Sequence, residues 1–121
     1  MTDKPNILIV DDEEGPREAL RMILKPSYNV FTAEDGYIAL EIMKQTPIDL
    51  ITLDLNMPGL TGMEVLKEVR DTNKEIPVLI ITAFGSIGSV TAANNYGVCN
   101  FIAKPFDVSE VTMAVQNSLN G

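Results

Sequence analysis

Residues 48–62 read Ile48-Asp-Leu-Ile-Thr-Leu-Asp-Leu-Asn-Met-Pro-Gly-Leu-Thr-Gly62, and this stretch decides the fold. Its apolar run from Leu50 to Leu53 is typical of a strand that is buried on both faces. Met57-Pro58-Gly59 then predicts a turn, because proline fixes φ, lacks an N–H group and lies beside a flexible glycine. We therefore expect Asp54 at the carboxyl end of a strand, where open α/β sheets place their ligand sites.

Four more short runs predict strands, and a helical pattern follows each strand. The expected strands cover residues 6–10, 28–33, 50–53, 76–82 and 98–103. The helical patterns run from Pro16 to Leu24, from Gly36 to a stop at Thr46-Pro47, from Thr61 through Val69, from Ser86 to Tyr96 and from Asp107 through Leu119. The mixed polarity of residues 28–33 indicates a strand at the sheet edge. This alternation predicts one doubly wound, flavodoxin-like (βα)5 domain, with a five-stranded parallel sheet of order 2-1-3-4-5 and helices on both faces.

Length and charge limit the classes of function. The 121 residues suffice for one domain, residues 1–121, but not for two. Nine basic against 17 acidic side chains give a net charge of −8, which disfavours direct nucleic-acid contact. No apolar run approaches the roughly 20 residues of a membrane span, so we expect a cytoplasmic protein without membrane contact.

Cysteine and histidine usage narrows the chemistry. The single cysteine, Cys99, cannot form an internal disulfide and is expected to be a buried small hydrophobic residue. Histidine is absent, which removes histidine-based metal sites and histidine-activated nucleophiles from this chain. Carboxylates, hydroxyls and lysine remain as the reactive groups.

Polar side chains follow four of the predicted strands. They are Asp11 and Asp12, Asp54, Thr82 and Lys104. In the order 2-1-3-4-5 the three aspartates converge at the switch point of the sheet. Two unit charges about 4 Å apart repel by ~4 kcal/mol at an effective dielectric of 20. The formal sum of −3 and +1 is −2, which a divalent cation with oxygen ligands would cancel, and Mg²⁺ is our prediction.

Each of these residues also has a simpler interpretation. Asp11-Asp12 could cap the first helix, Thr82 could be an ordinary β-former, and Lys104 could be a solvated charge. Asp54 is harder to explain in this way, because the apolar run before it offers a carboxylate no partner. The joint occurrence at four strand ends favours one shared site for metal-assisted phosphoryl chemistry.

Four motifs resemble the receiver domains of two-component response regulators, which are CheY-like proteins. They are Ile9-Val-Asp-Asp-Glu13, Leu53-Asp-Leu-Asn-Met-Pro-Gly59, Ile81-Thr-Ala83 and Ala103-Lys-Pro-Phe106. The resemblance extends over essentially the whole chain. It implies a phosphorylation-dependent signalling switch rather than an enzyme with a separate substrate, and it implies that Asp54 accepts a phosphoryl group from a sensor histidine kinase or a phosphotransfer protein.

The resemblance also implies the roles of the neighbouring residues. Asp12, Asp54 and the backbone carbonyl of Asn56 would bind Mg²⁺ directly, and Asp11 would assist through water. Lys104 would contact the phosphoryl group, with a cis peptide bond at Pro105. Thr82 would move toward the phosphoryl oxygens while Phe101 turns inward.

Two aromatic residues affect how the expected switch would work. Phe101 lacks the hydroxyl of the tyrosine that many relatives carry there, so coupling would depend on packing alone. Phe84 offers no polar group to orient an attacking water, so we expect slow self-dephosphorylation. Phosphorylation would add a charge of about −1.5 to −2 and so change the surface that binds partners. The expected partner is an output domain beyond residue 121 or a separate downstream protein. Dimerisation on phosphorylation is a further expectation.

Two other functions fit the predicted fold. An aspartate-nucleophile phosphohydrolase would need a second acid two residues after Asp54, where the chain has Asn56. A flavodoxin-like FMN carrier would need hydroxyls and amides in the first loop, where Asp11 and Asp12 would repel a phosphate. Both alternatives are weaker than the signalling switch.

Overall fold

The computed structural model describes residues 4–72, 75–83, 94–98 and 100–120. Its strands are β1 (Asn6–Val10), β2 (Asn29–Ala33), β3 (Leu50–Leu53), β4 (Val78–Ala83) and β5 (Asn100–Lys104). Its helices are α1 (Glu14–Leu24), α2 (Gly36–Gln45), α3 (Gly62–Thr72) and α5 (Val108–Asn120), with a 3₁₀ turn, η2 (Asn94–Tyr96). All strand pairs are parallel and the order is β2-β1-β3-β4-β5, so the predicted fold class is confirmed.

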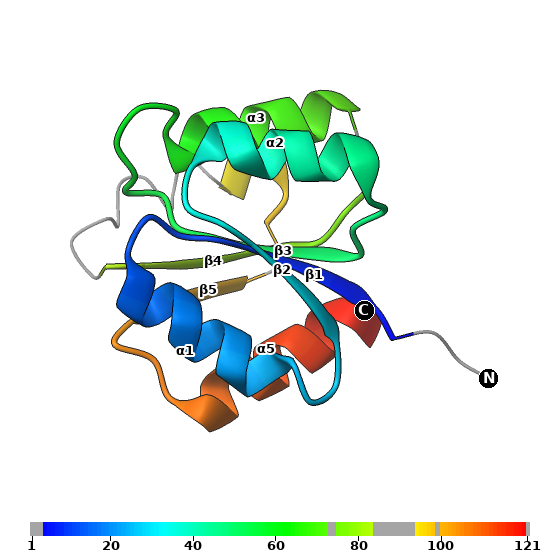
Figure 1. Cartoon of the computed structure of the whole chain (residues 1–121), viewed down its shortest axis with the longest axis vertical. Helices are drawn as coiled ribbons and strands as arrows, with labels where there is room; N and C mark the ends of the chain where they lie inside the picture. The colour runs from blue at the N-terminus through cyan, green and yellow to red at the C-terminus, as the bar shows by residue number, and fades with distance from the viewer. Residues whose placement is uncertain (1–3, 73–74, 84–93, 99, 121) are drawn as a thin grey trace.

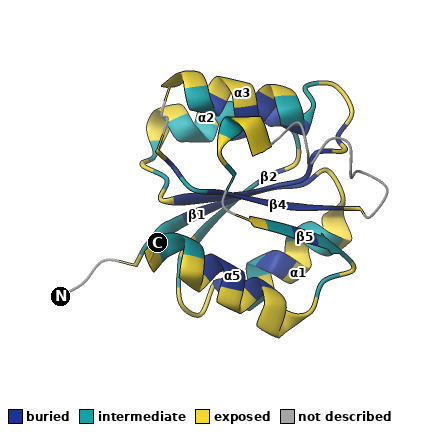
Figure 2. Cartoon of the chain, turned by 180° about the vertical axis from the view of Figure 1, so that it is seen from behind, coloured by how far each residue is buried: buried dark blue, intermediate teal, exposed yellow. Residues whose placement is uncertain are grey.

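The sheet is covered on both faces. Helices α2 and α3 lie on one face, and α1 and α5 lie on the other (Figure 1). Each face has its own apolar core, one containing Leu8, Ile51 and Ile80, the other Ile7, Leu50 and Leu79. Adjacent residues of one strand thus enter opposite cores, which is why β1 and β3 read as continuous apolar runs. Figure 2 shows these central strands as the most buried part of the molecule.

The helix ends follow the local sequence signals. Thr61 and Glu64 form the expected capping box, in which the Glu64 amide donates to Thr61 Oγ1 and Glu64 Oε1 accepts from the Thr61 amide. Asp35 caps α2 by accepting from the Ile38 amide. Asp107 caps α5 in the same way, accepting from the amide of Glu110 at 2.7 Å. Short side chains at the starts of these helices therefore define how the loops enter them.

Two predictions concern the segment before β5. The expected helix over residues 86–96 lies mostly outside the described residues, and Cys99 also lies outside them. The described part of that range, Asn94–Tyr96, forms the 3₁₀ turn η2. Strand β5 begins at Asn100, two residues later than predicted. Arg70 of α3 holds the intervening chain, donating hydrogen bonds to the carbonyls of Tyr96 and Gly97, and it also bonds the carbonyl of Ile76 before β4.

The register brings the strand ends together at one edge. Val10 pairs with Ala33 on one side and with Leu53 on the other. The next residues continue the ladder, because the Asp54 amide donates to the Val10 carbonyl at 3.0 Å and the Asp11 amide donates to the Ala33 carbonyl at 3.1 Å. Asp11 and Asp54 therefore leave neighbouring strands at the same level. In the described part of the chain, no helix is long and apolar enough to cross a bilayer.

Candidate functional site

Asp54 is a buried carboxylate whose two oxygens are both occupied. Only 3% of its side chain is exposed. Its Oδ1 accepts hydrogen bonds from Thr82 Oγ1 at 2.7 Å and from the Asn56 amide at 2.9 Å. Its Oδ2 accepts from Lys104 Nζ at 2.9 Å. The two side-chain partners, which the local sequence could not reveal, come from the ends of β4 and β5.

Asp11, Asp12 and Asp54 form one cluster. Each offers a carboxylate oxygen, and these three oxygens lie within 4.8 Å of one another. Asp11 Oδ1 accepts from the Glu13 amide at 2.9 Å. Asp11 Oδ2 forms an ion pair with Lys104 at 2.9 Å, but it accepts no well-aligned hydrogen bond within the described chain. This buried oxygen retains lone pairs for a further ligand.

Burial changes the titration of this cluster. It raises the pKa of Asp11 above its ordinary value, and the nearby Lys104 and the Glu13 amide only partly offset that effect. The pKa of Lys104 responds to two opposing effects. Burial by itself lowers it, but the adjacent carboxylates of Asp11, Asp54 and Glu13 raise it well above the usual lysine value. Lys104 is therefore a permanent cation at neutral pH, held among acids.

The cluster fits a hard divalent cation. All its donors are oxygens, it has a surplus of negative charge, and Asp11 Oδ2 is buried without a hydrogen bond. Mg²⁺ prefers such oxygen ligands and keeps part of its water shell. Asn56 adjoins the cluster, because its amide is bonded to Asp54. The residues predicted from the sequence as metal ligands are thus brought to one place.

The expected switch residues lie on β4 and β5. Thr82 is fully buried, and Phe101 is half-buried against the core beneath α2 and α3. Thr82 pairs with Ala103, and Ile80 pairs with Phe101, so the side chains of Thr82 and Phe101 point to the same face of the sheet. The Lys104-Pro105 peptide bond is cis, as expected. Phe84 lies outside the described residues.

Two residues at the site were not identified from the sequence. Glu13 Oε1 accepts a hydrogen bond from Lys104 Nζ at 3.0 Å, although the two residues are 91 positions apart. Arg17 Nη1 donates to the backbone carbonyl of Asp11 at 2.9 Å. The only local signal for Glu13 is its place in an acidic run, which more often marks a solvated surface.

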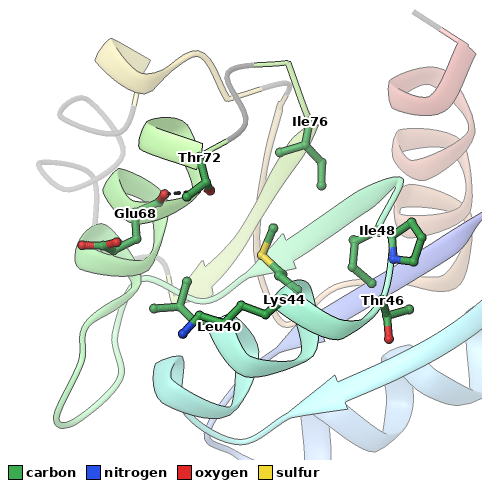
Figure 3. Close-up of a pocket in the computed structure, with 9 residues that line it drawn as sticks. Leu40, Lys44, Thr46, Ile48, Glu68, Thr72 and Ile76 are labelled. Atoms are coloured by element: carbon green, nitrogen blue, oxygen red, sulfur yellow. Dashed lines mark hydrogen bonds between the residues drawn. The ribbon is translucent and has the colours of Figure 1, made fainter.

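Among the described residues, two hollows are candidate binding sites. One of about 400 Å³ is lined by Asp12, Glu34, Asp35, Tyr37, Pro58, Gly59 and Leu60, and it adjoins the acidic cluster. The other, of about 470 Å³, lies between α2, α3 and the residues leading into β3 and β4, and Leu40, Ile48 and Ile76 contribute to its largely apolar wall (Figure 3). This second hollow is at the amino ends of the strands, away from the carboxylate cluster. The carboxyl edge is therefore the chemical site.

Comparison with known proteins identifies the family. The response regulator receiver domain model matches residues 7–116. Sporulation initiation phosphotransferase F of Bacillus subtilis is 38% identical over 93% of this chain and 92% of its own length. Transcriptional regulatory protein GlrR of Escherichia coli is 36% identical over 98% of this chain but only 27% of its own length. The chain thus spans nearly all of one relative and about a quarter of the other.

Solved structures agree with this result. The receiver domain of NtrX from Brucella abortus superposes with a TM-score of 0.89 at 31% identity, covering 94% of this chain and 98% of that one. Chemotaxis protein CheY4 of Vibrio cholerae gives a TM-score of 0.90 at 31% identity, covering 96% and 99%. The chain therefore belongs to the family of response regulator receiver domains, which are regulatory domains of phosphorylation-dependent two-component signalling.

Proposed function

We propose that Asp54 is the phosphoryl acceptor of this receiver domain. The observation that carries the proposal is the position of the Asp54 carboxylate, which is buried at a strand end between Thr82, Lys104 and the acidic cluster. A buried carboxylate with an ammonium and a hydroxyl beside it can act as a nucleophile toward phosphorus while its surroundings stabilise the transferred group.

The donor would be the phosphohistidine of a sensor histidine kinase or of a phosphotransfer protein. An Asp54 oxygen forms a bond to phosphorus, and the phosphorus–nitrogen bond to the histidine breaks. The imidazole nitrogen takes the electron pair and then a proton. The product is an acyl phosphate on Asp54, in which the ammonium of Lys104 balances part of the charge on the phosphoryl oxygens.

Mg²⁺ is the expected cofactor, because receiver domains use this ion at an acidic pocket and the present cluster fits it. Asp12, Asp54 and the carbonyl of Asn56 would hold it directly, and Asp11 would hold one of its waters. When bound, Mg²⁺ would neutralise charge on the acids and on the phosphoryl oxygens. Among the described residues, Lys104 forms ion pairs with Asp11, Glu13 and Asp54, so this one ammonium faces a surplus of carboxylates, which supports the assignment.

Thr82 and Phe101 would transmit the change. Thr82 already donates to the acceptor carboxylate, so a new phosphoryl oxygen offers its hydroxyl a second acceptor. Phe101 lies on the same face of the neighbouring strand, where it can follow by packing. The altered surface would then bind a different partner or a second copy of the chain, and phosphorylation-dependent dimerisation is included in the proposal.

The broader setting follows from the relatives. Receiver domains work with kinases and output domains, and we propose that residues 1–121 form one such domain in the cytoplasm. Its output would be a further domain beyond residue 121 or a separate protein that controls transcription or another response. The domain itself would turn over no substrate other than its own phosphoryl group, and its net charge of −8 argues against direct nucleic-acid contact.

Intact-mass spectrometry tests the acceptor. The protein is incubated with acetyl phosphate and Mg²⁺, and the wild type should gain the mass of one phosphoryl group. Asp54→Ala should gain none, whereas Asp71→Ala, which removes an exposed acid of α3, should label like the wild type. Labelling of Asp54→Ala at the wild-type level, or no labelling of the wild type, would reject the proposal.

A further inference from the structure

Three carboxylates contact Lys104, and only one of them, Asp54, belongs to the proposed phosphoryl acceptor. Its Nζ lies 2.9 Å from Asp54 Oδ2, 2.9 Å from Asp11 Oδ2 and 3.0 Å from Glu13 Oε1. A lysine ammonium has three N–H donors. Two of these contacts, to Asp54 and Glu13, are hydrogen bonds, and the contact to Asp11 is an ion pair without an aligned hydrogen bond. A phosphoryl oxygen that approaches Lys104 must therefore compete with three carboxylate oxygens that already lie within 3.0 Å of the ammonium.

The three carboxylates differ in how easily they can be displaced. The side chains of Asp11 and Asp54 are 2% and 3% exposed, so a released oxygen there would lose its partner without gaining water. The side chain of Glu13 is 61% exposed, and water can solvate it at once. Exposed ion pairs contribute little free energy. Glu13 is therefore the contact that Lys104 can give up at the lowest cost.

We propose that Glu13 is a positioning residue that occupies, on Lys104, the place later taken by a phosphoryl oxygen. In the resting domain it holds the ammonium at the solvent-facing rim of the site, and it competes with the phosphoryl donor for that ammonium. The inference rests on the proposed role of Lys104 as the phosphoryl contact. It adds a residue that regulates access to this contact.

The first loop is built to hold Glu13 in this position. The Asp11 carboxylate accepts from the Glu13 amide, and Arg17 Nη1 bonds the Asp11 carbonyl. The amide of Arg17 also donates to the Glu13 carbonyl at 3.1 Å. The backbone on both sides of Glu13 is therefore tied down, which directs its side chain across to Lys104 on β5.

Steady-state phosphorylation by acetyl phosphate tests the competition, with Mg²⁺ saturating and intact mass as the readout. Glu13→Gln should lower the KM for acetyl phosphate by about two- to fivefold, the range that an exposed ion pair supports, and should leave kcat unchanged. Glu13→Asp keeps the charge but is one methylene shorter, so it should lower KM as well. Glu14→Gln removes the same charge one residue away, where the described structure shows no ion pair to Lys104, and should change KM less.

A double-mutant cycle distinguishes the direct contact between Glu13 and Lys104 from the general effect of removing a negative charge near the site. In a Lys104→Met background, Glu13→Gln should change KM no more than Glu14→Gln does, because the shared partner is gone. Equal effects of Glu13→Gln and Glu14→Gln in the wild-type background, or an unchanged KM in Glu13→Gln, would overturn the inference. KM is measured only for protein that becomes phosphorylated at Asp54. A change in KM is therefore distinguishable from the loss of labelling that would reject the proposed function.

Discussion

The Thr82 hydroxyl donates a 2.7 Å hydrogen bond to Oδ1 of Asp54, and both side chains are buried. The two residues are 28 positions apart and lie at the ends of β4 and β3. This bond connects the proposed acceptor directly to β4, which pairs with the strand that carries Phe101, so a change in the charge of Asp54 acts directly on Thr82.

Thr82→Val keeps the shape of the side chain and removes this bond. A hydrogen bond to a charged group contributes about 1.5–3 kcal/mol, and we expect a loss of unfolding free energy in this range. Thr52→Val is the matched control, because Thr52 is also buried but its Oγ1 has no partner in the described structure. Urea unfolding measures both variants. A Thr52→Val loss as large as that of Thr82→Val would contradict the assignment.

Mg²⁺ should stabilise the folded domain through the acidic cluster. A ligand that binds only the folded state at 100 times its Kd adds about 2.7 kcal/mol. Asp12→Asn removes one proposed ligand and should abolish most of the rise in Tm on adding Mg²⁺. Asp71→Asn, on the outer surface of α3, should respond like the wild type. An equal Mg²⁺ response in Asp12→Asn and wild type would place the ion elsewhere.

Gly62 lets α3 begin directly against the acceptor loop. A Cβ at this position would lie 2.3 Å from the backbone oxygen of Asp54 and 2.5 Å from Cα of Leu55. Gly62→Ala should therefore cost about 1–3 kcal/mol of stability and slow labelling of Asp54, since the backbone itself must shift. Gly15→Ala meets nothing within 4 Å and should be neutral or stabilising by roughly 0.5–1 kcal/mol. Calorimetry compares the two variants.

The raised pKa of Lys104 has a defined effect on stability at high pH. The ammonium is favoured in the folded state, so its contribution is complete below the unfolded-state pKa of 10.5 and is lost as the pH rises through the higher folded-state pKa. Without Mg²⁺, the unfolding free energy of the wild type should fall more steeply above pH 10.5 than that of Lys104→Met. The exposed Lys67→Met should follow the wild type. Parallel curves for wild type and Lys104→Met would exclude the effect.

Local patterns were sufficient for most elements. The continuous apolar run of Leu50–Leu53 predicted a strand buried on both faces, and the Thr61–Glu64 spacing predicted the capping box that begins α3. The start of β5 was less predictable, because Val98 continues the apolar pattern but the chain before Asn100 is held by Arg70 of α3. Contacts from a distant helix override a short local pattern there.

By itself, the sequence determined which residues stand at the carboxyl ends of the strands, since strand periodicity, turn residues and caps are local properties of the chain. It therefore determined that Asp11, Asp12, Asp54, Thr82 and Lys104 share one edge. Only the tertiary structure decided which of them touch, that Asp11 keeps a buried oxygen without a hydrogen bond, and that Glu13 joins Lys104 across 91 residues. Such contacts depend on tenths of an ångström in helix and strand packing, and no local pattern of residues encodes them.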